Sequence, residues 1–238
     1  ASSDKKGLIT TLKKAVAEFN NIPTHDFETP KIGIVGEVYV KYNSIGNNHT
    51  IAYLLQHGIE PILPPIVNMF AQWFVNINIK NQILLDKRPI AKLLTNAIEP
   101  YYTKIDKEFE NTLKDFKYYT PKHSITELAN HAQQATNLSC HYFGEGWLIA
   151  GDILAFAKNG INNILCLQPF GCIANHVIAR GIENKLKEIQ PNLNILYLDI
   201  DAGVSPVNLH NRLYLLIKNA QKQTKNLCPK PLPLNQQF

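Results

Sequence analysis

Cysteine and histidine, the side chains best suited to metal ligation and nucleophilic chemistry, gather around one turn of this sequence. The segment Cys166-Leu-Gln-Pro-Phe-Gly-Cys172-Ile-Ala-Asn-His176 begins in an apolar run, residues 163–167, that is typical of a buried strand. Ligand sites of open α/β sheets lie beyond the carboxyl ends of strands. A polar turn in this position is therefore where we expect chemistry.

Two other apolar runs end in similar polar turns. Glu37 follows residues 31–35, and Asp199 and Asp201 follow residues 194–198. Parallel strands bring the turns that follow them to one edge of the sheet. The side chains predicted to line one cleft there are Glu37, Gln168, Cys172, His176 and Asp201.

The two thiols of this segment have different predicted surroundings. Cys166 lies inside the apolar run, where a buried thiol acts as a small hydrophobic side chain. Cys172 follows a Pro-Phe-Gly turn at a predicted helix start, and the helix dipole favours the thiolate that ligates iron or attacks electrophiles. We expect Cys172 to be the most reactive thiol. His176, one helical turn later, either shares a metal or pocket with Cys172 or pairs with a nearby carboxylate.

Each carboxylate also has two interpretations. Glu37 could act as a base if it is buried, or it could accept hydrogen bonds from backbone amides at a helix start. Asp199 and Asp201 could ligate a cation. The structural interpretation, in which backbone amides of the turn before Ser205 hold one of them, is favoured.

Composition narrows the classes of protein. The 238 residues, 45% of them hydrophobic, are enough for a substantial core. The net charge of +5 comes from scattered lysines, densest around Lys218 and Lys222, and no nucleic-acid-binding motif accompanies it. Gly33-x-x-Gly36 lacks the pattern of a dinucleotide-binding turn. Binding of nucleic acids or nucleotides is therefore disfavoured.

The four cysteines are too few for a disulfide scaffold in a chain of this length. No apolar run reaches the roughly 18 residues of a membrane span, and the first residues lack targeting character. These features predict a cytoplasmic protein that does not enter a membrane. The opening residue, Ala1, indicates a chain cut from a longer polypeptide.

Hydrophobic spacing predicts alternating strands and helices. Strands are expected from Lys31 and over residues 59–63, 163–167 and 194–198, and helices over 8–20, 47–56, 66–76, 82–99, 104–116, 125–134, 147–158, 173–189 and 207–219. Asn47 or Asn48 caps the second helix and Gly58 closes it. Pro61 indicates an edge strand, and Pro100 a helix break.

This order predicts a flavodoxin-like, doubly wound α/β fold with a mostly parallel sheet. The expected parts are an N-terminal helix and linker over residues 1–30, an α/β domain over 31–220 with a helical insertion at about 65–136, and a proline-rich tail over 221–238. The strands and capped helices are locally consistent, so we expect the chain to fold without metal.

Taken together, the motifs resemble a known family. They are residues 31–40, Gly144-Glu-Gly-Trp-Leu148, Gln168-Pro-Phe-Gly-Cys172 with Asn175-His176, and residues 199–205 with Asn208, Asn211 and Arg212. This set resembles the dehydratase-like region of acyl-CoA dehydratase activase-related proteins, relatives of 2-hydroxyglutaryl-CoA dehydratase components. The resemblance covers about residues 31–218 and is most specific at Gln168–Cys172.

The resemblance implies an anaerobic system in which an ATPase activator delivers a low-potential electron to an iron–sulfur protein that dehydrates a 2-hydroxyacyl-CoA. It implies Cys172 as a cluster ligand, Glu37 and His176 as catalytic residues, and Gln168, Asp201 and Ser205 as cofactor-binding residues. Helix starts at Cys172 and Ser205 suit an anionic ligand such as a coenzyme A phosphate group or a negatively charged cluster.

The sequence departs from the full family pattern. It has no activator-type ATPase segment and lacks the half in which further cysteine ligands are expected. An iron–sulfur cluster would therefore need an ATPase domain and a second cysteine-bearing α/β domain, in the same chain or in a partner. The alternative function is a non-catalytic α/β interaction module that has lost its cofactor.

Overall fold

The computed structural model describes residues 5–24, 28–82, 89–201, 203 and 205–224. Contacts divide the chain into two units, one of residues 1–26 with 80–122 and one of residues 27–79 with 123–238. The sequence-based division instead places its boundaries at residues 30, 65, 136 and 220. Most of the predicted proline-rich tail lies outside the described residues.

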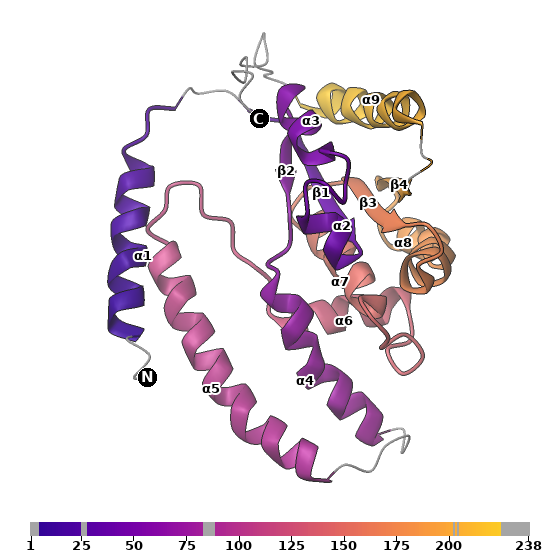
Figure 1. Ribbon diagram of the computed structural model, residues 1–238. Coiled ribbons are helices and arrows are strands. Elements are labelled where there is room, and N and C mark those ends of the chain that lie inside the picture. The colour runs from indigo at the N-terminus through magenta and orange to yellow at the C-terminus, as the bar shows by residue number, and fades with distance from the viewer. Residues whose placement is uncertain (1–4, 25–27, 83–88, 202, 204, 225–238) are drawn as a thin grey trace. The chain divides into compact units, whose positions relative to one another are not determined.

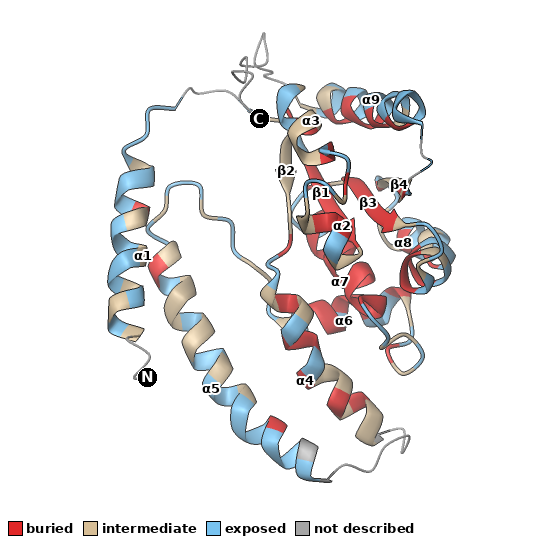
Figure 2. Ribbon diagram, in the orientation of Figure 1, coloured by how far each residue is buried: buried red, intermediate tan, exposed pale blue. Residues whose placement is uncertain are grey.

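The larger unit is a flavodoxin-like α/β fold built on a four-stranded, all-parallel sheet (Figure 1). Its strands are β1 (Lys31–Gly36), β2 (Glu60–Ile62), β3 (Asn163–Pro169) and β4 (Asn194–Ile200), in the order β2-β1-β3-β4. The central strands β1 and β3 are buried along almost their whole length, whereas β2 is only partly buried (Figure 2). The predicted edge position of the strand containing Pro61 is confirmed.

Helices cover both faces of this sheet. Helices α3 (Thr50–Gln56) and α9 (Pro206–Gln223) pack on one face, where Leu54, Leu213 and Ile217 join the strand residues Ile34 and Leu165 in a common core. On the other face lies α7 (Gly146–Lys158), whose Phe156 packs against Gly33 closely enough that a Cβ there would clash with it. Helix α6 (Ile125–Ala135) packs on α7 and begins with a capping box between Ser124 and Glu127.

The remaining elements of this unit connect the strands. They are α2 (Val38–Tyr42), most of α4 (Val67–Gln82), the π-helical turn η1 (Ala174–Ala179) and α8 (Glu183–Ile189). The helix predicted over residues 173–189 has its predicted start and end, but Ile182 interrupts it between η1 with its flanking residues and α8. The N-cap of α3 is His49, not an asparagine, although the Asn47 side chain accepts a hydrogen bond from the Thr50 amide at 3.1 Å.

The smaller unit pairs α1 (Lys5–Asn20) with α5 (Pro89–Leu113). Lys5 lies 2.5 Å from Glu108, and the rings of Phe19 and Phe116 meet edge to face. Helix α5 continues through Pro100, so the predicted break there is wrong. A proline inside a helix removes one backbone hydrogen bond without always ending the helix. No helix among the described residues is both long enough and apolar enough to cross a membrane.

Candidate functional site

The carboxyl ends of β1, β3 and β4 meet at one edge of the sheet, which we call the carboxyl edge. Gly36 of β1 lies opposite Leu167 of β3, and Gln168 lies opposite Asp199 of β4. Gly36 has φ +117°, and a Cβ there would overlap the carbonyl oxygen of Leu167, so only glycine fits. The Glu37 amide then donates to this same oxygen at 3.0 Å. The predicted convergence of the turns at one edge is confirmed.

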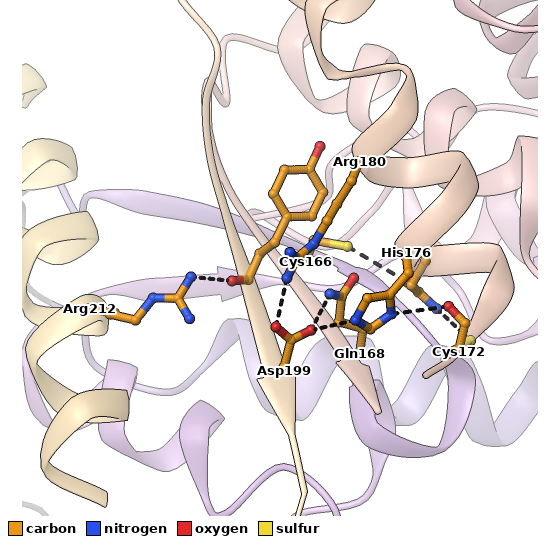
Figure 3. Close-up of polar contacts among 9 residues, drawn as sticks. Cys166, Gln168, Cys172, His176, Arg180, Asp199 and Arg212 are labelled. Carbon is orange, nitrogen blue, oxygen red and sulfur yellow. Dashed lines mark hydrogen bonds and ion pairs between the residues drawn. The ribbon is translucent and has the colours of Figure 1, made fainter. Parts of the chain in front are cut away.

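Asp199 is the centre of a polar network at this edge (Figure 3). Its carboxylate accepts hydrogen bonds from the Gln168 amide and, at 2.7 Å, from the Arg180 guanidinium, and it lies 3.1 Å from His176 Nε2. Burial alone would raise the pKa of Asp199, but the Gln168 hydrogen bond and the Arg180 charge outweigh it and lower the pKa below its ordinary value. The network therefore holds a carboxylate in its ionised form.

His176 is fixed by contacts at both ring nitrogens. Its Nδ1 lies 3.2 Å from the carbonyl oxygen of Cys172, and its Nε2 faces Asp199. The backbone amide of His176 also donates to the Cys172 carbonyl at 2.8 Å. This ring is oriented by the chain itself, which matches the predicted alternative in which it pairs with a carboxylate.

Asn175 separates the two thiols of the predicted site. Its side chain is fully buried, its Nδ2 lies 3.1 Å from Cys172 Sγ, and its Oδ1 lies 3.7 Å from Cys166 Sγ. Burial raises the pKa of Cys166 to about 12, so this thiol keeps its proton and donates to Oδ1. The amide group of Asn175 then points to Cys172, whose sulfur acts as a hydrogen-bond acceptor.

The π-helical turn η1 positions Asn175 and His176. The Arg180 amide bonds the carbonyl of Asn175 five residues earlier, which is the hydrogen bond of a π-helix. Such turns contain one residue more than an α-helical turn and are frequent at functional sites. From this turn Asn175 contacts the two sulfur atoms and His176 contacts Asp199.

Other predicted site residues lie at the same edge but are satisfied locally. The Glu37 carboxylate accepts from the Val40 amide at 3.0 Å and caps α2. The exposed Asp201 accepts from the Gly203 amide, and Ser205 is the N-cap of α9 without a side-chain capping bond. The structural interpretations of Glu37 and Asp201 are confirmed, and the cofactor-binding role of Ser205 stays a prediction.

Three charged residues of this region were not singled out by the sequence patterns. They are Lys41, Asp152 and Arg180. The buried Glu145 accepts from the Val38 amide at 2.9 Å, so carboxylates from two segments cap α2. Asp152 is a single carboxylate in α7, a helix whose other buried residues are apolar or glycine. This contrast is the sequence signal that could have identified it.

The described residues do not form a complete metal site. They contain no cluster of three or more side chains that could hold a metal ion. Cys166 is a buried thiol and Cys140 is an exposed residue of another loop, so Cys172 is the one described sulfur that is partly exposed at the carboxyl edge. These residues fit a single ligand and do not fit a complete cluster, whose iron atoms take four cysteine ligands.

The geometry of the carboxyl edge is the main evidence on what this chain does. No protein-family model matches the sequence, and neither a curated protein nor a solved structure matches it. Evidence on function therefore comes from the side chains at this edge.

Proposed function

We propose that this chain is a domain of an iron–sulfur-dependent 2-hydroxyacyl-CoA dehydratase or activase-related protein. In this proposal it contributes Cys172 as one ligand of a cluster whose other ligands come from a second cysteine-bearing α/β domain. Iron–sulfur clusters supply one-electron transfer. The assignment to this family is supported by the resemblance of the motif Gln168–Cys172. The role of Cys172 as a cluster ligand is supported by its position at the carboxyl edge.

The single observation that carries the proposal is the orientation of Asn175 between the two thiols. A sulfur that accepts a hydrogen bond suits the thiolate state required of a metal ligand. Cys166, with a pKa raised to about 12, remains a buried thiol. The chain thus distinguishes its two neighbouring cysteines and holds Cys172 as the acceptor at the edge.

Anaerobic co-expression with an activator-type ATPase and a second cysteine-bearing α/β domain tests the proposal. Iron and sulfide analysis of the purified assembly should show bound cluster, and the Cys172→Ser variant should lose most of its iron. Cys140→Ser is the comparison variant, since Cys140 is an exposed cysteine of a different loop, and it should keep its iron. Equal iron content in the two variants would remove Cys172 from the cluster.

One observation favours the alternative, a non-catalytic interaction module. Phe170, Ile173 and Val177 are 74%, 73% and 63% exposed, although all three are large apolar side chains close to the carboxyl edge. Exposed apolar side chains in one segment are typical of a docking surface. An assembly that forms with its partners and contains no iron or sulfide would favour this alternative.

A further inference from the structure

The first half of α5, residues 89–101, presents an apolar face to solvent. Five large side chains of this half are between 46% and 72% exposed: Ile90, Leu93, Leu94, Ile98 and Tyr101. At 3.6 residues per turn they fall within about 140° of the helix circumference. The charged residues of the same half, Lys92 and Glu99, lie on the opposite side of the helix. We call the five side chains the exposed face of α5.

The second half of α5 is covered by α1. Lys5 of α1 lies 2.5 Å from Glu108, and Thr112 is buried. Figure 2 shows the corresponding difference along α5, whose first half is mostly exposed and whose second half is mostly half-buried. A helix with a wide apolar face normally packs this face against another element. The exposed face of α5 therefore needs a partner of its own.

The spacing of this face is suited to a second copy of the same helix. Ile90, Leu94, Ala97 and Tyr101 are four, three and four residues apart, which is the spacing of core positions in a coiled coil. This spacing is the same when it is read in either direction. Two copies that run antiparallel therefore place Ile90 opposite Tyr101 and Leu94 opposite Ala97, twice each.

The sizes of the side chains favour the antiparallel direction. Facing positions pack best when a large side chain meets a small one, as Leu94 meets Ala97 in this arrangement. Two parallel copies would instead place Ala97 opposite Ala97 and leave a gap between two bulky layers. The pattern is thus complementary to itself in the antiparallel direction.

The exposed area is sufficient for a symmetric dimer. From their exposed fractions, the five side chains offer about 600 Å² per copy, so a pair can cover at most about 1,200 Å², against the ~1,000 Å² that a specific interface needs. An interface of this size is at the lower end of the range for stable complexes. We therefore expect a dimer that dissociates on dilution.

We propose that the exposed face of α5 binds the same face of a second copy of this chain, antiparallel and with two-fold symmetry. Leu93 and Ile98 then flank the core positions, while Lys92 and Glu99 stay in water on the far side of each helix. The inference uses no residue of the carboxyl edge and does not depend on the proposed function.

Sedimentation velocity of the full chain over about a hundredfold range of concentration tests the proposal. The wild type should change from monomer to dimer as its concentration rises. Leu94→Glu should raise the dissociation constant at least hundredfold, because the two-fold axis brings two carboxylates into a contact without water. The matched control is Lys92→Glu, which introduces the same residue on the opposite side of the helix and should leave the dissociation constant unchanged.

Hydrogen exchange of the wild-type chain gives a second readout that needs no variant. Backbone amides of residues 90–101 should exchange more slowly when the protein is concentrated enough to dimerise. Amides of β3, a buried central strand, should exchange at the same rate at both concentrations. This comparison decides the question if circular dichroism shows that Leu94→Glu is unfolded.

The other possible occupants give different results. A wild-type chain that stays monomeric at every concentration overturns the proposal. If that monomer binds phosphatidylserine vesicles and Leu94→Glu does not, the occupant is a lipid surface; if its α5 amides are already protected on dilution, the occupant is another segment of the same chain. A dimer that Leu94→Glu does not weaken uses a different surface and also overturns the proposal. Iron content plays no part in these readouts, so their failure is distinct from failure of the cluster proposal.

Discussion

Asp152 is the group through which pH should most directly change the stability of this protein. Its side chain is buried in α7, and burial raises its pKa from 3.8 to about 7, while Lys41 acts in the opposite direction. In the unfolded chain the carboxyl loses its proton near pH 4. Between these values the folded protein holds a proton that the unfolded chain has released.

The sign and size of the effect follow from proton linkage. Because the folded state binds more protons, the free energy of unfolding falls by about 1.4 kcal/mol for each pH unit between about pH 4 and pH 7. The rise in the pKa of Asp152 from 3.8 to about 7 therefore lowers the free energy of unfolding by ~4 kcal/mol in total, and the full loss is reached above pH 7. Asparagine cannot ionise. We expect Asp152→Asn to be stabilised relative to the wild type by ~4 kcal/mol more at pH 8 than at pH 3.

Urea unfolding followed by circular dichroism from pH 3 to pH 8 measures this difference. The other titrating groups are common to both proteins, so their contributions cancel in the comparison. Asp201→Asn is the control, since Asp201 is exposed and its carboxylate bonds the Gly203 amide. A stability difference between Asp152→Asn and the wild type that is the same at pH 4 and pH 8 would refute the reasoning.

Further expected results concern the thiols, the strand ends and metal removal. Alkylation followed by peptide mapping should label Cys172 at least tenfold faster than the buried Cys166, and equal rates would contradict the assignment of Cys172. Gly36→Ala should lower the free energy of unfolding by about 3 kcal/mol or more, whereas Gly171→Ala, with positive φ but open space, should cost only ~1 kcal/mol. Asp199→Asn should destabilise the protein more at pH 7 than at pH 3, because the stability that a lowered pKa contributes decreases as the pH falls below 3.8. Chelator treatment should leave the far-ultraviolet circular dichroism unchanged; loss of helix would show that folding needs metal.

Much of the fold could be predicted from local patterns. The alternation of apolar runs with helical spacing predicts the parallel strands, and the closing glycines Gly58 and Gly160 end their helices with positive φ, as expected. The extent of α5 was not predictable in the same way, since Pro100 tolerates either a break or a continued helix depending on its packing.

The turn η1 was missed for a different reason. Its sequence has ordinary helical spacing, and what distinguishes it is the set of contacts that its residues make with other segments. Asn175 meets the thiols of Cys166 and Cys172, and Arg180 meets Asp199 of the neighbouring strand. Tertiary contacts of this kind decide where a helix contains an extra residue. They do not change the hydrophobic spacing of the sequence, so the spacing cannot predict them.

The position of the candidate site could be predicted from the sequence, but its buried charged residues could not. Strand ends are recognisable, so the positions of Gln168, Cys172 and His176 at the carboxyl edge could be expected. Lys41 lies in a helix of five residues, too short for periodicity to show which side is buried. Charged residues are also rarely buried, so a pattern alone assigns Lys41 to the solvent.

The polar groups at the carboxyl edge are of two kinds. Some have hydrogen-bond or ionic partners within the chain, and some do not. Asp199 and His176 are paired with side chains or backbone of this chain, which suits groups that hold the edge in shape. The Oε1 atom of Gln168 is buried and has no hydrogen-bond partner among the described residues, although Nε2 of the same side chain donates to Asp199. An unpaired buried polar atom lowers the free energy of unfolding unless water or another group meets it, so the two polar atoms of this one side chain differ in what they contribute to stability.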